Sequence, residues 1–253
     1  MVTGIVAAAL ILGFAAVIAY GNARWSGTSK EIIEQLSQRD GESSPASPSV
    51  YHEEEIAGLP APVRRYFRKA LTDGQPIITG ARMRQSGSFN MGRHEDQWKP
   101  FTADQIVKPG QPGFLWDARI RMMPGLPAYV HDSYANGTGL LHGALYGLVT
   151  VTEARDTPEV SRGEFLRYLA ETAWYPTALL PSQGAIWEPV DDTSARVTLT
   201  DDSARDGPLS VTMLFRFNDD DLIESVYAEE RGAEINGEFV PTPWEGRWWS
   251  YEE

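Results

Sequence analysis

The chain has 253 residues and a formal net charge of −13, with 42% hydrophobic and 23% charged residues. This mixture is typical of a globular protein with a substantial core, and the acidic balance argues against nucleic-acid binding, which requires clustered Lys and Arg. The sequence contains no cysteine, so disulfides, thiolate nucleophiles and Cys-ligated metals are excluded.

The first segment, VTGIVAAALILGFAAVIAY at residues 2–20, is apolar and uncharged. A helix of this length spans about 28 Å, close to the roughly 30 Å of a bilayer's hydrocarbon core. We therefore predict a transmembrane anchor at residues 1–23, with Tyr20 and Trp25 at the membrane interface. A cleaved signal peptide is the alternative, because Gly-Asn-Ala at residues 21–23 suits a cleavage site.

The charges beside this segment give a weak orientation signal. Arg24 and Lys30 follow it and nothing basic precedes it, which favours a cytoplasmic C-terminal domain. Glu31 and Glu34 lie next to these cations, so both sides of the membrane stay open. We predict a single-pass membrane protein of unassigned orientation.

A short helix and a linker are predicted at residues 24–50. Apolar side chains at residues 32, 33 and 36 have helical spacing. The Ser/Pro-rich segment GESSPASPS, residues 41–49, is typical of a flexible spacer. One domain is expected to follow, at residues 51–253, and its first helix is predicted at residues 59–74.

From residue 82 onward, apolar residues recur at every second position. In residues 114–122, for example, Trp116 and Ile120 alternate with charged side chains, which indicates half-buried antiparallel strands. Residues 161–181 interrupt this pattern with a predicted helix that begins at a Ser161/Glu164 capping box. The predicted fold class is α+β: a strongly curved antiparallel sheet, or half-barrel, with helices on its concave side, preceded by the transmembrane helix.

Motifs for chemistry are absent from the sequence. We find no nucleophile elbow, phosphate loop, dinucleotide fingerprint or metal-binding signature, so no catalytic residue, metal or cofactor is predicted. The four histidines, His52, His94, His131 and His142, are scattered. His131 adjoins Asp132, but neighbouring strand residues face opposite sides. A hydrolase that uses His131 or His142 with a carboxylate is the alternative function.

The aromatic content is the more unusual feature, with eight tryptophans in the chain. Several aromatic and methionine residues fall on predicted inward faces or corners: Trp116, Met122, Trp174, Trp187, Phe215 and Trp244. A packed core is one interpretation. The other is an apolar cavity for a lipid or acyl chain, because methionine and flat aromatic walls suit ligands of variable shape.

Four segments together resemble an uncharacterised bacterial family of membrane-anchored domains of unknown function: LPAPVRRYFRKAL, PGFLWDARIRMMPGLPAYVHDSY, RYLAETAWYPTALLPSQGAIWEPVDDTSARVTLTD and PTPWEGRW. The resemblance covers nearly everything after residue 55. It implies a fold similar to the LolA/LolB lipoprotein carriers, an open curved sheet with helices over an apolar cavity. Members of that family usually continue past WEGRWWSY, so the resemblance also implies a C-terminus truncated at Glu253.

The sequence thus predicts a membrane-tethered, non-enzymatic domain that binds a lipid-like ligand in a half-barrel cavity. The alternatives are the histidine-dependent hydrolase and an envelope interaction module with no small ligand.

Overall fold

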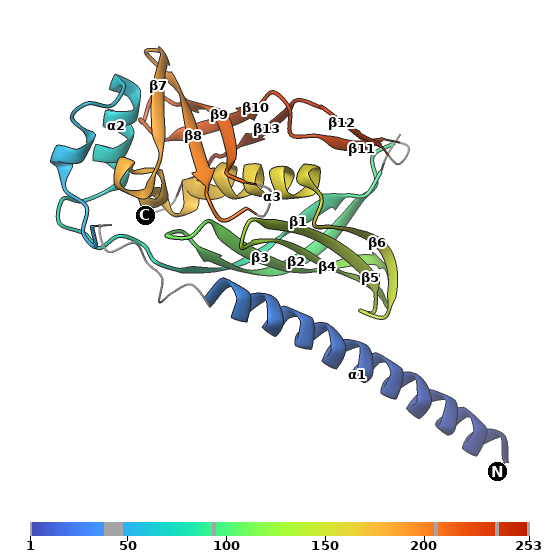
Figure 1. The fold of residues 1–253 in the computed structure, drawn as a ribbon. Coiled ribbons are helices and arrows are strands. Elements are labelled where there is room, and N and C mark those ends of the chain that lie inside the picture. The colour runs from blue at the N-terminus through green and yellow to red at the C-terminus, as the bar shows by residue number, and fades with distance from the viewer. Residues whose placement is uncertain (1, 38–47, 93–94, 205–206, 236–237, 252–253) are drawn as a thin grey trace.

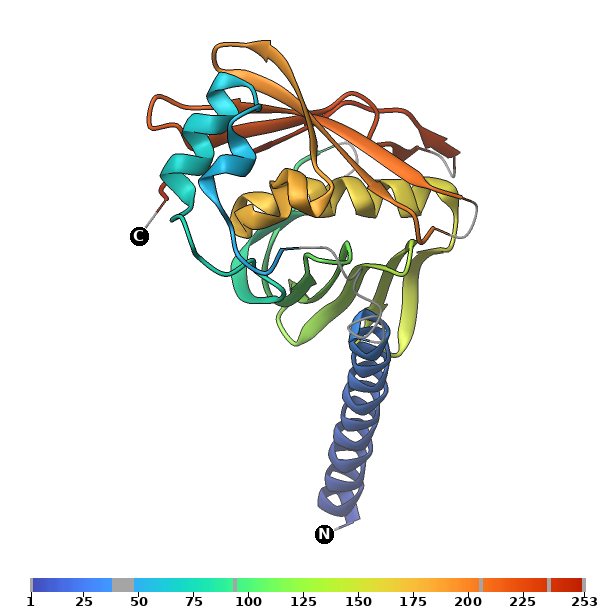
Figure 2. The same cartoon turned by 60° about the vertical axis from the view of Figure 1, so that its left-hand side comes forward.

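The structure is a computed structural model that describes residues 2–37, 48–92, 95–204, 207–235 and 238–251. A long N-terminal helix leads into a domain of two antiparallel sheets, and helix α3 lies between the sheets (Figure 1). Figure 2 shows the same layers from a second direction, with the N-terminal helix projecting away from the domain. The predicted α+β class is confirmed.

Helix α1 (Val2–Ser37) is a single continuous helix. The predicted anchor and the short helix after it are therefore one element, without a break near residue 23. The helix is long and apolar enough to cross a membrane. Of the predicted Ser/Pro-rich spacer, residues 41–47 lie outside the described residues.

The first sheet has six strands in sequential order. They are β1 (Ala81–Asn90), β2 (Trp98–Lys108), β3 (Gly113–Met123), β4 (Leu126–Ala135), β5 (Thr138–Leu145) and β6 (Val149–Arg155). Each strand pairs with the next, so the sheet is an antiparallel meander. The β4–β5 turn has positive φ angles at Asn136 (51°) and Gly137 (74°), the conformation that a two-residue hairpin turn requires.

The second sheet has five strands in the order β13-β10-β9-β8-β7. Its strands are β7 (Ile186–Asp191), β8 (Ser194–Asp201), β9 (Leu209–Phe217), β10 (Ile223–Ala228) and β13 (Trp244–Arg247). Strands β11 (Ala233–Ile235) and β12 (Glu238–Val240) pair with each other in a separate two-stranded sheet. The prediction of one sheet was wrong in this respect. The chain between β6 and β7 forms helices, so these two strands end different sheets instead of pairing.

The helical segments cover the ends and the interior of the sheets. Helix α2 (Ala61–Ala70) lies against β8, and α3 (Pro158–Ala170) packs on both sheets. Three 3-10 helices continue α3 as far as Gln183. The predicted capping box was wrong: Thr157 caps α3 by accepting a hydrogen bond from the backbone of Val160 (3.3 Å). Ser161 instead accepts one from the backbone N–H of Gly139 (3.0 Å) and joins α3 to β5.

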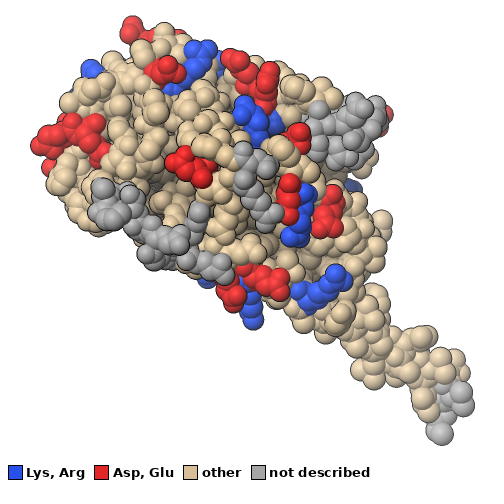
Figure 3. All heavy atoms as spheres, viewed as in Figure 1, with Lys and Arg blue, Asp and Glu red and all other residues tan. Residues whose placement is uncertain are grey.

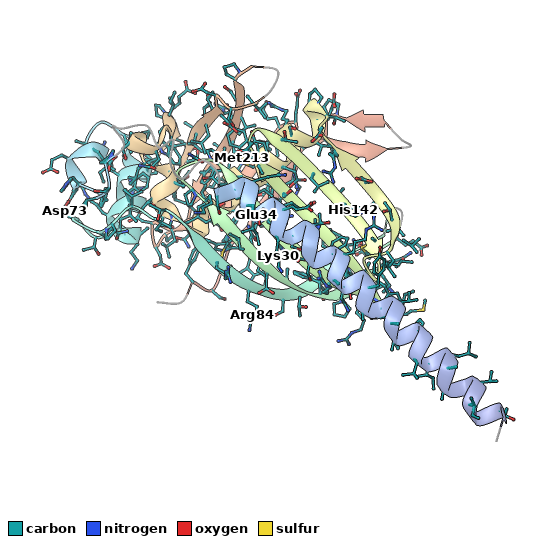
Figure 4. All side chains as sticks on the ribbon, turned by 60° about the horizontal axis from the view of Figure 1, so that its bottom comes forward. Lys30, Glu34, Asp73, Arg84, His142 and Met213 are labelled. Atoms are coloured by element: carbon teal, nitrogen blue, oxygen red, sulfur yellow. The ribbon has the colours of Figure 1, made fainter. Side chains whose placement is uncertain are left out.

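Helices cover part of both faces of the six-stranded sheet. Trp116 lies in the core on the inner face toward α3, and Ile120, four residues on, is buried on the same face, as the alternating pattern predicted. Leu115 lies on the outer face, where it packs with Ile32 and Leu36 of α1. Figure 4 shows this second half of α1, marked by Lys30 and Glu34, lying across the strands while the first half runs beyond the sheet. The second half of α1 is thus part of the domain.

Candidate functional site

The six residues predicted to line a cavity lie on different elements, but four of them belong to or pack against one hydrophobic core: Trp116, Trp187, Phe215 and Trp244. Trp187 and Phe215 pack in the second sheet with their ring centroids 5.6 Å apart. Trp116 is buried on the inner face of the first sheet, Trp244 lies on strand β13, and Trp174 is 44% exposed. Trp116, Trp187, Phe215 and Trp244 thus contribute to one packed core, which is the other interpretation that the sequence allowed.

Pockets in the described part of the chain involve other side chains. Five of them open at the surface, and none of the six predicted residues lines any of these five. Met122, the sixth of the set, is half-buried near the end of β3. An apolar cavity lined by these six residues therefore remains a prediction, and the five pockets do not support it.

Two of the six, Trp116 and Trp244, each cover a guanidinium group. Cζ of Arg167 lies 4.8 Å from the ring centroid of Trp116, and Cζ of Arg231 lies 4.8 Å from that of Trp244. Such contacts between a cation and an aromatic face stabilise a desolvated charge. They lead to a group of ionisable side chains, which we call the inter-sheet ionic cluster: Asp132, Glu164, Arg167, Glu171 and Arg231.

Arg167 of α3 is the centre of this cluster. It forms ion pairs with Asp132 of β4 and with Glu171, whose Oε1 lies 2.8 Å from Nε of Arg167. Gln105 extends the network by donating a hydrogen bond to Oε2 of Glu171 (2.5 Å). Trp116 is linked to the same network through Gln85, which accepts from the indole N–H (2.7 Å) and donates to Gln105 (2.7 Å).

The cluster holds three acidic groups and two guanidinium groups. Burial raises the pKa of Glu164 well above its ordinary value, and the nearby Asp132 carboxylate raises it further. Oε2 of Glu164 has no hydrogen-bond partner among the described residues, and this side chain belongs to a residue that is only 8% exposed. A proton on Glu164 leaves two negative and two positive charges, so the protonated form suits this site.

Sequence analysis missed this cluster, although it carries a signal. Glu164, Arg167 and Glu171 are spaced by three and four residues, so they share one face of the helix predicted to cover the sheet. A charged stripe on a buried helix predicts partners on the sheet it covers. Asp132 is such a partner, but strand β4 by itself does not show which helix covers it.

The outer face of the same sheet carries a second polar group, centred on Asp117. Trp25 of α1 donates an indole hydrogen bond to Oδ1 of Asp117 (2.9 Å), and Ser29 donates to Oδ2 (2.8 Å). Arg119 forms an ion pair with the same carboxylate. Burial raises the pKa of Asp117, but its contacts with His131, Arg119 and Trp25 outweigh burial and lower it below its ordinary value. We call Asp117, Trp25, Ser29 and His131 the anchor contact.

His131 is fully buried in this contact. Its Nε2 lies 2.8 Å from Oγ of Ser29 and 3.7 Å from Oδ2 of Asp117, and its ring stacks on Trp25 with the centroids 3.9 Å apart. A catalytic triad places serine and aspartate on opposite ring nitrogens. Here both groups face Nε2, while Nδ1 has no partner among the described residues. The arrangement holds the helix and does not suit a proton relay.

His142 lies beside His131, because the two are paired across strands β4 and β5. It stacks on the other part of Trp25 (5.1 Å between centroids) and its Nε2 lies 3.1 Å from the Thr150 hydroxyl. Burial lowers the pKa of His142. The two histidines proposed for the hydrolase thus form a platform under one tryptophan, and His94 lies outside the described residues.

The two predicted interface residues differ in their surroundings. Tyr20 is 65% exposed, whereas Trp25 is 2% exposed because the sheet covers it. Gly21 explains how the helix reaches the sheet so closely: a Cβ there would collide with the backbone oxygen of Tyr146. Trp25 in this structure therefore contacts the sheet, and Tyr20 remains at the helix surface.

Metal binding has a weak candidate among the described residues. Ligand atoms of His52, Glu54 and Asp73 lie within 4.8 Å of one another. All three side chains are exposed, and exposed acidic groups of this kind are common without an ion. This group carries no functional argument.

These features define an α+β domain of two antiparallel sheets with an N-terminal helix that could span a membrane. Residues 57–253 match the model of a family of unknown function, DUF6920, and the chain belongs to this family. The match confirms the part of the resemblance that concerns a domain of unknown function. No curated protein and no solved structure matches the chain.

We predict that Trp25→Ala releases the second half of α1 from the sheet. Truncation of a buried tryptophan costs about 3–5 kcal/mol, so amide hydrogens of residues 26–36 should exchange roughly 100-fold faster or more. Hydrogen exchange read by mass spectrometry measures this. Leu12→Ala, on the exposed half of the helix, is the control and should leave these rates unchanged. Equal protection in Trp25→Ala and the native chain would contradict the role of the anchor contact.

A second prediction concerns pH. Because the pKa of Glu164 is raised in the folded state, the folded chain holds a proton that the unfolded chain releases above about pH 4. This contribution to the free energy of unfolding is complete below that pH and declines as pH rises through the raised pKa. Glu164→Gln keeps a neutral side chain and should show a flatter decline in urea unfolding between about pH 4 and pH 8. The exposed Glu188→Gln serves as the control, and identical pH slopes in all three proteins would exclude a buried proton on Glu164.

Proposed function

We propose that this chain is a membrane-tethered, non-enzymatic interaction module whose anchor helix fixes the orientation of the domain at the membrane surface. One observation carries the proposal. Helix α1 passes without interruption from an exposed apolar segment into a segment that is packed on the six-stranded sheet. The domain therefore cannot turn freely about its anchor while this packing persists.

The first half of α1 is suited to lipid. Most of its large apolar side chains from Ile5 to Tyr20 are between 53% and 70% exposed, and Ile18 is half-buried. In the view of Figure 3 this projecting segment carries no charged residue, whereas both charge signs are spread over the domain. A bilayer is the environment in which such a helix is stable, because all its backbone groups are hydrogen-bonded within the helix.

The anchor contact supports a fixed orientation in place of a loose tether. The half-buried Asp117 and the buried His131 lie beneath α1, and detaching the helix would remove the hydrogen bonds from Trp25 and Ser29 to these two side chains. Leaving a buried polar group without its partner costs about 1–3 kcal/mol, more for a charged one. Apolar contacts of Ile32 and Leu36 add to this cost. A loose tether would need none of these interactions.

Non-enzymatic function is supported by the use of the two candidate histidines. His131 is inaccessible beneath Trp25, and His142 is occupied by the same ring and by Thr150. A general base must reach the proton that it abstracts. Presentation of a binding surface requires neither histidine to be accessible, and the partner would be a membrane component or a membrane-associated protein.

A second candidate function retains the apolar ligand and the half-barrel similar to the lipoprotein carriers. It is favoured by a pocket at the β3–β4 hairpin whose lining includes Phe101, Ile120, Met123 and Leu126. The position of α3 on the inner face of the first sheet also fits helices over a concave surface. In this version the ligand would enter at the hairpin end of the sheet.

The tethered-module proposal predicts a narrow distance distribution between spin labels at Leu12→Cys and Gly110→Cys. The full chain would be reconstituted in phosphatidylcholine–phosphatidylglycerol vesicles and measured by pulsed electron spin resonance. Adding Trp25→Ala and Ser29→Ala should broaden the distribution severalfold. A distribution that is equally broad without these substitutions would refute a fixed orientation, and extraction of the native chain by alkaline carbonate would refute the tether.

The second candidate function predicts a co-purifying amphiphile. Native mass spectrometry of the full chain should then detect a bound lipid, and Leu126→Asp should reduce its occupancy at least tenfold. Val190→Asp places the same charge on the exposed surface of the second sheet and should leave the occupancy unchanged. A native chain that carries no lipid would remove this candidate.

A further inference from the structure

Exposed apolar side chains of the six-stranded sheet gather at one end. They are between 38% and 62% exposed and comprise Phe89, Met91, Trp98, Met123, Val149 and Val151. All six lie at or beside the turns that follow β1, β3 and β5. In an antiparallel meander these three turns share one end of the sheet, and the turns after β2 and β4 share the other.

The same end is the one from which α1 projects. Leu36 of α1 lies near Gly113 at the start of β3, while Gly21 lies against Tyr146 and Leu148 in the β5–β6 turn. Passing from residue 36 to residue 21 therefore moves toward the three exposed turns. Figure 4 shows the helix leaving the sheet in this direction, past the strand that carries His142.

The β5–β6 turn reaches beyond the point where α1 leaves the sheet. The Tyr146 ring contacts the Phe14 ring, with centroids 6.1 Å apart. Its hydroxyl also bonds the backbone oxygen of Gly125, which joins this turn to the β3–β4 turn. Phe14 is six residues before Tyr20, a distance of about 9 Å along a helix. The turns thus extend alongside the apolar segment itself.

Length then places these turns relative to a bilayer. The apolar segment from Val2 to Tyr20 is about 28 Å long, and it must use nearly all of that length to cross a hydrocarbon core of about 30 Å. With Tyr20 at the interface, the level of Phe14 lies within the bilayer. Tyr146 and the turns beside it would then enter the lipid.

We propose that the β1–β2, β3–β4 and β5–β6 hairpin ends form a second membrane-contact surface that inserts into the bilayer that α1 crosses. This inference rests on the proposed tether. Val149, Val151 and Met123 suit the acyl-chain boundary, and Trp98 suits the headgroup level, where tryptophan is favoured. The exposed cations Arg24 and Arg121 lie at the same end and suit anionic headgroups.

The acidic residues at this end set a limit on the depth. Glu95 and Asp96 are exposed beside the β1–β2 turn, and Asp96 accepts a hydrogen bond from Asn90. Carboxylates favour water over hydrocarbon, so this hairpin should lie shallower than the β5–β6 hairpin. The surface is therefore expected to be inclined, with its deepest part next to α1.

The absence of native cysteine permits a direct test in the full chain. Single variants Val149→Cys, Trp98→Cys, Leu12→Cys and Gly110→Cys would carry a nitrobenzoxadiazole label in phosphatidylcholine–phosphatidylglycerol vesicles. Gly110 lies in the turn after β2, at the opposite end of the sheet, and has open space for a side chain. The other three positions are 59–70% exposed, so the substitutions should not disturb the core.

Nitroxide-labelled lipids should quench the fluorescence of the labels at positions 149 and 12 at least twofold. The label at position 98 should be quenched when the nitroxide is near the headgroup. The label at position 110 should remain unquenched. Quenching at 12 without quenching at 98 and 149 would overturn the second surface and leave the tether intact. A blue-shifted but unquenched label at 149 would indicate that a second copy of the chain covers the turns, and would also overturn it. No quenching at 12 would overturn the tether and this inference together.

Discussion

The carboxylate of Asp117 is the contact on which the arrangement of helix and sheet depends. It lies on the outer face of β3, and two donors from α1 and one guanidinium from the sheet satisfy it. A buried carboxylate is costly unless it is paired and hydrogen-bonded. The packing of α1 is therefore specific: a different register of the helix would remove the hydrogen bonds of Trp25 and Ser29 and leave Asp117 only its contacts within the sheet, to Arg119 and His131. The polar groups thus select the position of the helix. The stacking of Trp25 on His131 and the packing of Ile32 and Leu36 then bury apolar surface at that position.

On the inner face of the same sheet, a carboxylate is also paired with a group from a helix, but the balance of charges differs. Asp132 is next to His131 in the chain and faces the opposite side, where Arg167 of α3 pairs with it. Each face of the sheet thus carries a half-buried carboxylate with a partner from a helix. On the outer face the charge is retained, because the surrounding donors lower the pKa of Asp117. On the inner face the acids outnumber the cations, and burial raises the pKa of Glu164, which favours its neutral form.

Together these contacts make the anchor helix, the first sheet and α3 a continuous stack. The exposed half of α1 and the three hairpin ends lie at one end of this stack, and the loops at the other end face away from them. The family is one of unknown function and identifies no reaction. The proposed function therefore rests on the difference between the two ends of this stack. A domain held in one orientation can present the same surface to its partner in every copy, which a domain on a flexible spacer cannot do.

Several of these features could be predicted from local pattern. Residues 2–20 predicted the apolar helix, and alternation predicted the strands and the inward position of Trp116. Those inferences succeed because hydrophobic periodicity and length are properties of short segments. Only the tertiary structure decided that the helix continues to Ser37, that the strands divide into two sheets, and that Trp25, His131 and Asp117 meet. Those contacts join residues about 90 to 105 positions apart in the chain. Such long-range pairing depends on which elements cover each face of the sheet, and no single segment of the sequence encodes that choice.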